Sequence, residues 1–393
     1  MPFVELKKMD AKMRFVSSAL SGEVSFSDLC GLYNISRETG YKWVRRYEEF
    51  GPAGLEELSR RPHSNSRSIG DECEELIREY RERYGWGPRK IRALIGMHHP
   101  KMHQPAVSTI AALLKREGFI KEKRRKRRRP GSTRLREPVA ANEVWSVDFK
   151  GEFRLGNREL CYPLTISDNY SRYLLGVQSL STTSIDRSKP VFERVFREYG
   201  LPRYIRSDNG SPFSSRSPGG LTRLSSWWVR LGISLEHIRP GHPEENGKHE
   251  RMHLTLKNET AKPPGKNPAS QQRRFNRFKH RFNEERPHEG IGMNTPNTFY
   301  SASTNPYPNT LPDLEYPGHH EVRRVRSSGE IKWKGNVVYL SAAIIGEYVS
   351  LNEINEDHWL VNYGHVTIGE LKRTSKSVLP LPPTDYREPK NCQ

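Results

Sequence analysis

Apolar residues in the first part of the chain recur at the three- and four-residue intervals of helices. The first helical stretch carries an apolar stripe made of Phe15, Val16, Ala19 and Leu20. Helices are then predicted at residues 26–33 and 37–47, joined by a turn in which Ile35 is the buried residue. With Ser36 as the cap of the second helix, the pattern is typical of a helix-turn-helix. We expect residues 1–58 to form one such domain.

A second helical unit is predicted at residues 68–120, after a polar linker. Helices are expected at 71–84, 88–95 and 105–118, and acidic residues at the start of the first favour its dipole. The last helix has an apolar stripe made of Val107, Ile110, Ala111 and Leu114. It ends at Gly118, which suits a C-cap. This unit is interpreted as a second helix-turn-helix, although packed helices with a solvated basic face would show the same pattern in either unit.

Residues 121–140 are predicted to be a basic linker. Its first part, Lys121–Arg129, has eight basic residues and one acid in nine positions, so it cannot pack into a core. Such a segment is either a solvated tether or a stretch that follows a phosphate backbone, and the sequence is compatible with both. In the second case we expect Arg124, Arg125 and Arg127 to contact DNA.

From residue 141 the pattern changes to short apolar runs typical of strands, interrupted by helical stretches. Strands are predicted at residues 144–149, 161–167, 174–179, 204–207 and 234–238. Helices are predicted at residues 191–199, 221–231, 246–260 and 271–283. Three strands, a helix, a strand, a helix, a strand and then helices are the element order of the ribonuclease-H-like fold. Residues 141–300 are therefore predicted to form an α/β catalytic core of that class.

After a linker rich in Ser, Asn and Pro, residues 320–377 read as short strands separated by turn residues. The predicted strands are 331–333, 337–340, 348–351, 358–363 and 366–368. Their number and size predict a small all-β, SH3-like barrel. Lys332, Trp333 and Lys334 lie on one of these strands, where they contact DNA or another protomer, or where the Trp is simply packed. The tail at 378–393 is Pro-rich and is expected to be unpacked.

Composition indicates a polyanionic partner. The 393 residues include 65 Lys and Arg and 46 Asp and Glu, which gives a formal net charge of +19 and a pI of about 9.8. Ribosomal, membrane-surface and heparin-type binding compete with DNA binding as explanations. The four cysteines are scattered without a zinc-ligand spacing, which fits a reducing compartment. No signal peptide or membrane span is predicted, so we expect a cytoplasmic, nucleoid-associated protein with no membrane partner.

Three acidic residues stand where a strand or a helix would present them. Asp148 lies inside an apolar strand between Val147 and Phe149, where an unpaired buried carboxylate costs several kcal/mol. Asp208 ends the fourth predicted strand, and Glu250 lies one turn into a helix. Three carboxylates brought together repel one another, and a fold that gathers them usually holds a divalent metal. Oxygen ligands suit Mg²⁺ or Mn²⁺.

Each acid alone also has an ordinary explanation. An Asp before Asn-Gly, such as Asp208, is commonly a turn residue, and a Glu early in a helix serves the helix dipole. Lys257 lies seven residues after Glu250, two turns along the same helix face, where it could grip substrate phosphate. The asparagine and glycine after Asp208 form a turn that exposes the end of the strand.

Three motifs surround these acids: Trp-Ser-Val-Asp-Phe at 145–149, Ser-Asp-Asn-Gly-Ser-Pro-Phe at 207–213, and Arg-Pro-Gly-His-Pro-Glu-Glu-Asn-Gly-Lys-His-Glu-Arg at 239–251. They resemble motifs of the retroviral-integrase-like DDE transposases of bacterial insertion sequences, and the resemblance covers essentially the whole chain. It implies a metal-dependent polynucleotidyl transferase and endonuclease. In that family the enzyme cleaves transposon-end DNA and joins the free 3′-hydroxyl to target DNA.

The resemblance also implies roles for individual residues. Asp148, Asp208 and Glu250 would be the catalytic, metal-binding triad, with Mg²⁺ as the cofactor and Mn²⁺ as its substitute. Lys257 would match the basic residue on the family's catalytic helix and contact DNA, and Asn209 and Gly210 would shape the site. Since family members act as multimers, the expected partners are double-stranded DNA, both transposon ends and target, and further copies of the chain in a homo-oligomer.

One feature departs from the family pattern. Asp208 and Glu250 are separated by 41 residues, a few more than the family's hallmark spacing. The longer gap leaves Glu244 and Glu245 as alternative third ligands, although both lie in a turn before the helix. Asp168, which ends a neighbouring strand, is interpreted as structural.

Two further interpretations of the function stay open. A DNA-binding regulator with an inert catalytic fold explains the helix-turn-helix units and the charge, but not the three acids. A ribonuclease-H-type nuclease would cleave RNA–DNA hybrids without joining strands, and the two DNA-reading units count against it. The residues of these units expected to contact DNA are Arg37, Lys42, Arg45, Arg46, Lys115 and Arg116.

Overall fold

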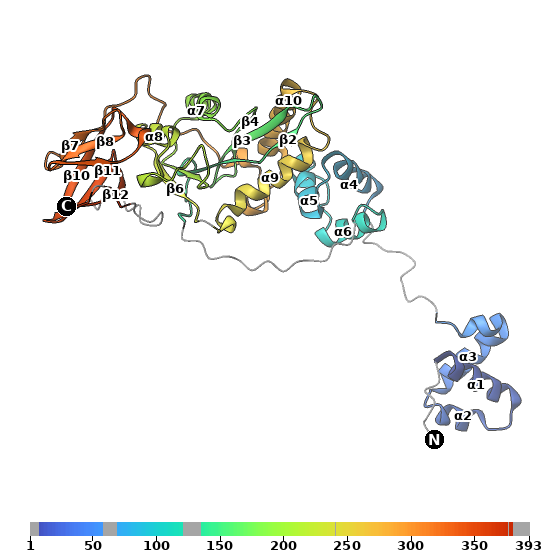
Figure 1. Cartoon of the computed structure of the whole chain (residues 1–393). Coiled ribbons are helices and arrows are strands. Elements are labelled where there is room, and N and C mark those ends of the chain that lie inside the picture. The colour runs from blue at the N-terminus through green and yellow to red at the C-terminus, as the bar shows by residue number, and fades with distance from the viewer. Residues whose placement is uncertain (1–7, 58–68, 121–134, 240, 376, 380–393) are drawn as a thin grey trace. The chain divides into compact units, whose positions relative to one another are not determined.

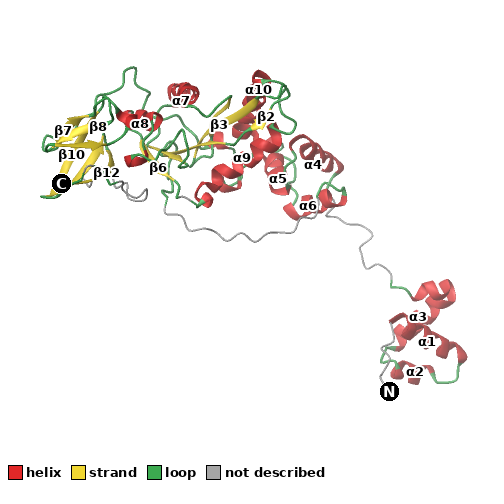
Figure 2. Cartoon of the chain, viewed as in Figure 1, coloured by secondary structure: helices red, strands yellow, loops and turns green. Residues whose placement is uncertain are grey.

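Two units make up the chain, Met1–Gly70 and Asp71–Gln393 (Figure 1). The computed structural model describes residues 8–57, 69–120, 135–239, 241–375 and 377–379. The basic run Lys121–Arg129 lies outside these residues, and so do the predicted DNA contacts of Arg124, Arg125 and Arg127. Helices form the first unit and the start of the second, and strands enter the chain only after them (Figure 2).

Three helices form the described part of the first unit. They are α1 (Lys8–Ser21), α2 (Phe26–Leu32) and α3 (Arg37–Phe50), followed by a 3-10 turn at Gly51–Leu55. The Ser36 side chain caps α3 by accepting the amide proton of Thr39, as predicted for a helix-turn-helix. Phe15 and Val16 of the predicted stripe are buried. Ala19 is half-buried against the same core, whereas Leu20 is 52% exposed, so the packed stripe ends at Ala19.

A glycine sets the distance between these helices. A Cβ on Gly40 of α3 would lie 2.8 Å from Cys30 Sγ and 2.9 Å from the ring of Phe15. Only glycine therefore allows α3 to pack so closely on α1 and α2. The close packing buries a core built from all three helices.

The second unit begins with three more helices, α4 (Asp71–Tyr84), α5 (Pro88–His98) and α6 (Val107–Arg116). Ile110 and Leu114 of α6 are buried as predicted, and Leu113 is buried with them. Val107 is only half-buried because it is the first residue of the helix. Gly118 follows α6 with φ +78°, the left-handed conformation that suits a residue ending a helix.

A six-stranded sheet forms the centre of the second unit. Its strands are β1 (Val144–Phe149), β2 (Phe153–Arg154), β3 (Leu160–Asp168), β4 (Leu174–Leu180), β5 (Tyr204–Ser207) and β6 (Ser234–His237). The path runs β3-β1-β5-β6, with β4 and the short β2 both paired to β3. β3 is antiparallel to β1 and β4, whereas β1, β5 and β6 are parallel. The predicted ribonuclease-H-like core is therefore confirmed.

Helices cover both faces of this sheet. They are α7 (Ile185–Tyr199), α8 (Arg223–Arg230), α9 (Gly247–Thr260) and α10 (Pro268–His280). Leu164 and Ile166 of β3 pack in the cluster that contains α7 and α8, whereas Cys161 packs with α9 and α10. Because side chains alternate along a strand, Thr165 and Ser167 face α9. None of the described helices is both long enough and apolar enough to cross a membrane.

The C-terminal part forms two further sheets. Its strands are β7 (Glu321–Arg324), β8 (Glu330–Trp333), β9 (Asn336–Tyr339), β10 (Tyr348–Asn355), β11 (His358–Tyr363) and β12 (Val366–Lys372). The predicted small β structure is present, as a sheet of order β12-β11-β10-β7 and a β8-β9 hairpin rather than one closed ring of paired strands. Trp333 is buried and packs on Trp359 at 4.8 Å between ring centres, so the packed alternative holds for it. Lys332 and Lys334 are exposed.

The C-terminal sheets share an apolar core with α7, α8 and the central sheet. A Cβ on Gly219, just before α8, would lie 2.7 Å from Ile368 of β12. The tail prediction is wrong for its first two residues. Val378 is 5% exposed, and Leu379 exchanges backbone hydrogen bonds with Glu370. Residues 380–393 lie outside the described part of the chain.

Candidate active site

Asp148 and Asp208 stand at the same level of two neighbouring strands. β1 and β5 run parallel with Ser146 opposite Arg206, and each Asp lies two residues further along. Trp145 and Val147 belong to the apolar cluster on the α7 side of the sheet. Alternation therefore turns Asp148 toward the opposite face, which α9 covers.

Glu250 approaches this pair from α9. The helix follows a 3-10 turn at Pro243–Asn246, and Glu250 is its fourth residue. Glu250 is exposed, whereas Met252 and Leu256 on the other side of the helix are buried. Lys257 is exposed two turns further along the same helix. The structure thus brings the three predicted acids to one side of the sheet, with the predicted lysine nearby.

The acids form one electrostatic site. Burial raises the pKa of Asp148 to about 7, and repulsion from Asp208 and, more weakly, from Glu250 adds to the shift. A hydrogen bond from the backbone of Phe149 and the charge of Lys150 oppose the rise without cancelling it. A carboxyl group with this pKa is partly protonated at neutral pH, and a bound cation would replace the proton.

A buried hydrogen-bond network lies beneath Asp148. Thr165 Oγ1 is 2.7 Å from Nε2 of both His249 and His253, and it donates to the backbone carbonyl of Asp148 at 3.0 Å. Ser167 Oγ is 2.8 Å from His249 Nδ1. Sequence reasoning missed these histidines as site residues. The available signal was their four-residue spacing on the helix that carries Glu250.

This network determines which ring nitrogens carry protons. The Thr165 hydroxyl has one proton and gives it to a carbonyl, so both Nε2–H groups donate to the Thr165 oxygen. His249 Nδ1 then accepts from Ser167, and His253 Nδ1 keeps a lone pair 3.6 Å from Asp148 Oδ2. Burial lowers the pKa of His249 to about 3 and that of His253 to about 2, so both rings are neutral at neutral pH.

Asp148, His249 and His253 also form a group of potential metal ligands, with one donor atom of each within 4.8 Å of the others. His249 already uses both nitrogens in hydrogen bonds, so it could ligate a metal only by breaking the network. His253 Nδ1 and Asp148 Oδ2 are two acceptors that face each other. Positive charge between them, a proton or a cation, relieves their repulsion.

Two other acids weighed from the sequence are engaged elsewhere. Asp168 is buried, and its carboxylate accepts two backbone amides and the Ser171 hydroxyl at 2.6–2.9 Å. Glu245 has a side chain that is 0% exposed, and it accepts from the amide and Nε of Arg239 at 2.8 and 2.6 Å. The side chain of Glu244 is not among those described. The oxygens of Asp168 and Glu245 therefore hold loops in place.

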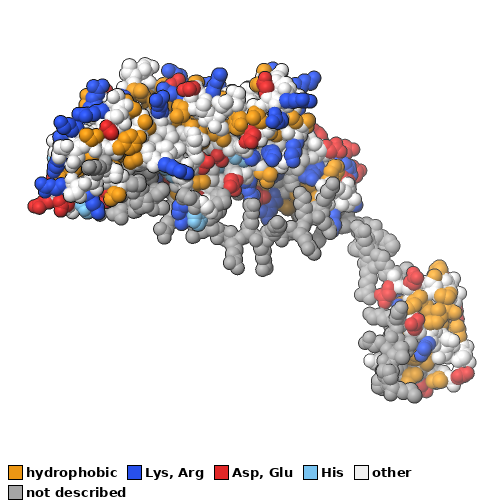
Figure 3. Space-filling view, viewed as in Figure 1, with side chains coloured by type: hydrophobic (Ala, Val, Ile, Leu, Met, Phe, Trp, Pro, Cys, Tyr) orange, Lys and Arg blue, Asp and Glu red, His pale blue; other side chains and the backbone are white. Residues whose placement is uncertain are grey.

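A hollow of about 790 Å³ opens beside Glu250. It lies between the start of α9, the start of α5, the turn after β3 and residues 282–290. Its cations are Lys90, Arg172, Lys248, Arg251 and Arg286. Figure 3 shows Lys and Arg side chains gathered over α9 and α5 in this part of the surface.

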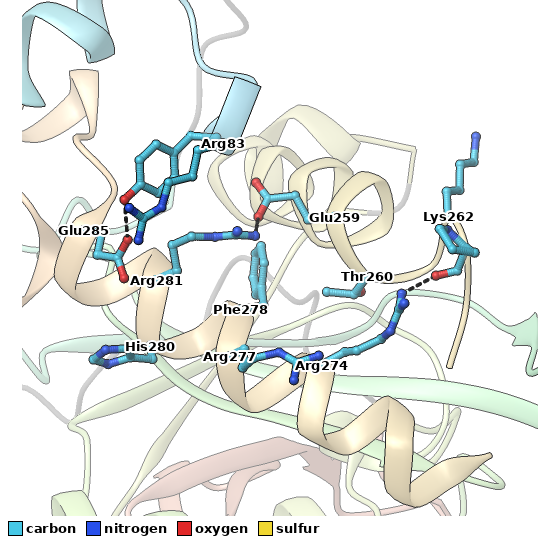
Figure 4. A pocket seen from close by; sticks show the side chains of 12 residues that line it. Arg83, Glu259, Thr260, Lys262, Arg274, Arg277, Phe278, His280, Arg281 and Glu285 are labelled. Atoms are coloured by element: carbon cyan, nitrogen blue, oxygen red, sulfur yellow. Dashed lines mark hydrogen bonds and ion pairs between the residues drawn. The ribbon is translucent and has the colours of Figure 1, made fainter. Parts of the chain in front are cut away.

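A second hollow, of about 510 Å³, lies between the end of α4, the end of α9 and α10 (Figure 4). Arg281 pairs with Glu259, Arg274 bonds to a backbone carbonyl, and Tyr84 donates to Glu285 at 3.0 Å. Among the residues that the structure describes as its lining, none is one of the three acids. Its polar groups largely bond to one another, and they join α4 to the core.

The basic residues predicted to bind DNA are mostly on the surface. The exposed ones are Arg37, Lys42, Arg45, Lys115 and Arg116. Arg46 is half-buried, donates to the carbonyl of Glu56 at 2.8 Å and lies over the ring of Trp43. Arg116 is 3.3 Å from Glu74, which reduces the charge that it can offer to DNA.

Known protein families match the regions that carry these features. An integrase core domain family matches residues 138–243, and a second integrase core domain family matches residues 231–296. A helix-turn-helix domain family matches residues 11–63, and a homeodomain-like domain family matches residues 39–114. The integrase matches together contain all three acids.

Proteins of insertion elements and retroviruses are similar to this chain. The uncharacterized 31.7 kDa protein of insertion element IS407 from Burkholderia multivorans is 27% identical over 236 residues, 57% of this chain and 78% of that protein. The uncharacterized 39.2 kDa protein of IS476 from Xanthomonas euvesicatoria is 25% identical, over 61% of this chain and 66% of that protein. The Gag-Pol polyprotein of baboon endogenous virus is 31% identical over 113 residues, and the chain spans only 6% of its length.

Among solved structures, the HTLV-2 integrase catalytic core domain in complex with magnesium has a TM-score of 0.34 at 16% identity, covering 42% of this chain and 100% of that chain. The simian T-cell lymphotropic virus intasome in complex with PP2A regulatory subunit B56 gamma has a TM-score of 0.37 at 14% identity, covering 72% and 91%. The domain matches and the insertion-element relatives agree with the sheet order and the helical units. The chain therefore contains an integrase core domain that follows helix-turn-helix domains, and it is similar to proteins of bacterial insertion elements.

Proposed function

We propose that this protein is a DNA transposase that binds the ends of an insertion sequence, cleaves the DNA to free 3′-hydroxyls and joins them to target DNA. The observation that carries the proposal is the placement of Asp148 and Asp208 at the same level of two parallel strands, where burial and repulsion from Asp208 and Glu250 raise the pKa of Asp148 to about 7. A fold that holds three carboxylates against their own repulsion is suited to divalent-metal chemistry. The insertion-element relatives and the helix-turn-helix matches support DNA as the substrate.

The donor set suits a hard divalent cation. Asp148, Asp208 and Glu250 would hold it, since carboxylate oxygens are the ligands that Mg²⁺ and Mn²⁺ prefer. The raised pKa of Asp148 and the acceptor of His253 that faces it both favour positive charge at this place. When bound, such a cation lowers the pKa of the attacking water or 3′-hydroxyl and neutralises charge on the leaving oxygen.

The residues around Asp208 keep this acid in position. The amide of Gly210 donates to Asp208 Oδ1 at 3.2 Å. Asn209 Nδ2 donates to the carbonyl of Ile238 at 2.6 Å, which fastens the loop after β5 to the end of β6. Rigid placement of this kind is what positioning of reacting groups requires.

The exposed side of α9 is the side that a DNA strand can reach. Glu250 lies near its start, and Lys257 is two turns further along, where its charge suits a phosphate of the strand. The exposed Arg37, Lys42 and Arg45 of α3 suit DNA binding by the first unit. Assembly as a homo-oligomer on DNA is part of the proposal.

The test is Mg²⁺-dependent cleavage of DNA that carries element ends and flanking sequence, followed by joining to a target duplex. We expect Glu250→Gln to bind this DNA as wild type does and to cleave it at least about a hundredfold more slowly, a loss typical of removing one charge-stabilising group. Glu193→Gln, on α7 at the opposite face of the sheet, is the matched control and is expected to cleave normally.

The outcomes separate the alternatives. Cleavage by Glu250→Gln at the wild-type rate would overturn its assignment. Tight DNA binding by wild type without any Mg²⁺-dependent nicking would favour an inert DNA-binding regulator. Cleavage of RNA–DNA hybrids without strand joining would favour a ribonuclease-H-type nuclease.

A further inference from the structure

Cations from distant parts of the chain gather in the hollow beside the start of α9. Lys90 comes from the start of α5, and Arg172 comes from the turn between β3 and β4. Lys248 and Arg251 belong to α9, and Arg286 follows α10 and its π-helical turn. The hollow therefore joins the helical part of the second unit to its catalytic core.

Two of these cations already have carboxylate partners. Lys248 pairs with Glu137, and Arg286 Nη1 lies 3.0 Å from Glu259. The other three are Lys90, Arg172 and Arg251. None of them has a carboxylate of the described residues at ion-pair distance. The chain itself thus leaves part of the positive charge of the hollow uncompensated.

The acids that line the hollow do not remove this excess. Asp168 is saturated by hydrogen bonds from backbone amides and a hydroxyl. Glu289 lines the hollow and favours the charged form of Lys90, but its ion pair, at 3.9 Å, is with Arg89, which does not line the hollow. Glu250 is exposed and belongs to the acid triad described above.

Arg172 has the features of a residue held in place for a ligand. Its φ is +68°, a left-handed conformation that residues other than Gly, Asn and Asp rarely adopt. Its guanidinium lies against Gly290, where an added Cβ would be 3.5 Å from Nε and Nη2. Nη1 is buried, and no described residue accepts a hydrogen bond from it. A guanidinium with an unused buried N–H is suited to a planar, multi-oxygen anion.

Lys90 is half-buried close to other cations of the hollow. Burial and the nearby charge of Arg286 lower its pKa to about 7, so it holds its proton weakly at neutral pH. An anion in the hollow would restore the full charge of this lysine. An anion bound in the hollow would therefore be favourable for both Lys90 and Arg172.

We propose that this hollow binds a phosphate group of a nucleic-acid strand, with Lys90 and Arg172 as its main ligands and Arg251 as a further contact. The site rests on the proposed function only for the choice of DNA as the source of the phosphate. The hollow would hold the backbone of the strand beside Glu250. Because Lys90 belongs to α5, DNA binding there would also fix α5 against the catalytic core.

The test measures DNA binding by the full chain in a metal chelator, where cleavage cannot occur. A fluorescein-labelled duplex of random sequence is titrated at several salt concentrations with wild type, Lys90→Gln and Arg172→Asn. Asn tolerates the left-handed conformation, so Arg172→Asn removes the guanidinium without opposing the backbone. Lys189→Gln makes the same charge change as Lys90→Gln and serves as the control, since Lys189 is a half-buried lysine of α7 that pairs with Glu193 on the other face of the sheet.

We expect Lys90→Gln and Arg172→Asn each to reduce the slope of log affinity against log salt by about 0.9, the value for one phosphate contact with duplex DNA. Lys189→Gln should keep the wild-type slope. Wild-type slopes in both site variants would overturn the proposal, and two variants on separate elements keep the test decisive when one of them folds poorly. Melting temperatures near that of wild type verify folding.

Inorganic phosphate at constant ionic strength separates the two sources of the group. Thermal protection of wild type by inorganic phosphate, together with unchanged DNA slopes in the variants, would mean that the hollow takes free phosphate and would overturn the proposal of a strand. Reduced slopes support it whether or not inorganic phosphate protects. An absence of cleavage by wild type would count against the proposed function and would leave this binding test unaffected.

Discussion

Replacing Asp148 with Asn removes a charge that burial in the folded core disfavours. On folding, the pKa of Asp148 rises from 3.8 to about 7, mainly through burial and secondly through repulsion from Asp208. Between these two values the folded protein binds the proton more tightly than the unfolded chain does. The free energy of unfolding therefore falls as pH rises across this window, and the loss is complete above the folded pKa. A shift of about three units corresponds to about 4 kcal/mol.

Asp148→Asn keeps the size of the side chain and abolishes this titration. In a metal chelator above pH 7, we expect its free energy of unfolding to exceed that of wild type by up to about 4 kcal/mol, and the difference to shrink toward pH 4. Urea unfolding followed by tryptophan fluorescence measures it, because Trp145 and Trp228 are buried in the same core. Asp186→Asn, an exposed acid in the first turn of α7, is the control and should follow wild type at every pH.

Mg²⁺ is expected to narrow the difference in the free energy of unfolding between the two proteins. A cation that binds only the folded state adds about 2.7 kcal/mol at one hundred times its dissociation constant, and Asp148→Asn should lose most of this gain. His249 and His253 are neutral in the folded protein above pH 4 but take up protons in the unfolded chain below their ordinary pKa of 6.5. This lowers the free energy of unfolding of wild type and variant alike on acidification, so it cancels in their difference. Parallel pH curves for wild type and variant, or equal stabilisation of both by Mg²⁺, would refute the idea that the acids oppose one another until a cation binds.

Two further substitutions test how the site is supported. Thr165→Val leaves the buried Nε2–H groups of His249 and His253 without their acceptor, so its free energy of unfolding in urea should fall by about 2–4 kcal/mol. Thr165→Ser keeps the hydroxyl and should lose about 1 kcal/mol or less. Equal losses in the two variants would contradict the network. Glu245→Gln breaks a buried pair with Arg239, and we expect a loss of about 3 kcal/mol in unfolding without a specific loss of cleavage. A stable Glu245→Gln protein that binds DNA but does not cleave it would make Glu245 the third ligand in place of Glu250.

The order of elements was predictable because the periodicity of each one is local. The helix predicted at 71–84 has those bounds in α4, and the strand predicted at 144–149 has those of β1. β2 and β7 were missed. β2 has two residues, too few to show alternation. β7 is Glu-Val-Arg-Arg, which shows no apolar run and becomes a strand only because it pairs with the edge of β10.

The acids were predictable and their surroundings were not. Asp148 stands out in the sequence because a lone acid inside an apolar strand demands an explanation. Thr165 does not stand out, since a threonine in a strand is ordinary. Its partners His249 and His253 lie 84 and 88 residues away, and only the packing of α9 on β3 brings them together. Contacts of such separation leave no periodic signal in the sequence.

The Pro-rich C-terminal tail also shows that composition does not predict individual tertiary contacts. Composition predicted an unpacked tail, and composition cannot register that Gly369 lacks the side chain that would block Val378. Val378 is buried in the space that a side chain at position 369 would occupy, and Leu379 pairs with Glu370 of β12 through backbone hydrogen bonds. Low apolar content therefore predicts where packing is weak on average. Whether a particular residue is buried depends on the space that the other elements leave.

The acid triad and the basic hollow are related by more than their closeness. In the chain alone, burial and then neighbouring negative charge raise the pKa of Asp148, and burial and then neighbouring positive charge lower the pKa of Lys90. A cation relieves the first cluster and a phosphate relieves the second, and a metal-bound phosphodiester supplies both together. Each ligand would thus find the other's presence favourable, and by reciprocity a divalent metal must raise the affinity for DNA by the same factor by which DNA raises the affinity for the metal. With the two charge clusters on adjacent surfaces, the proposed cation and the proposed DNA strand would bind more tightly together than separately.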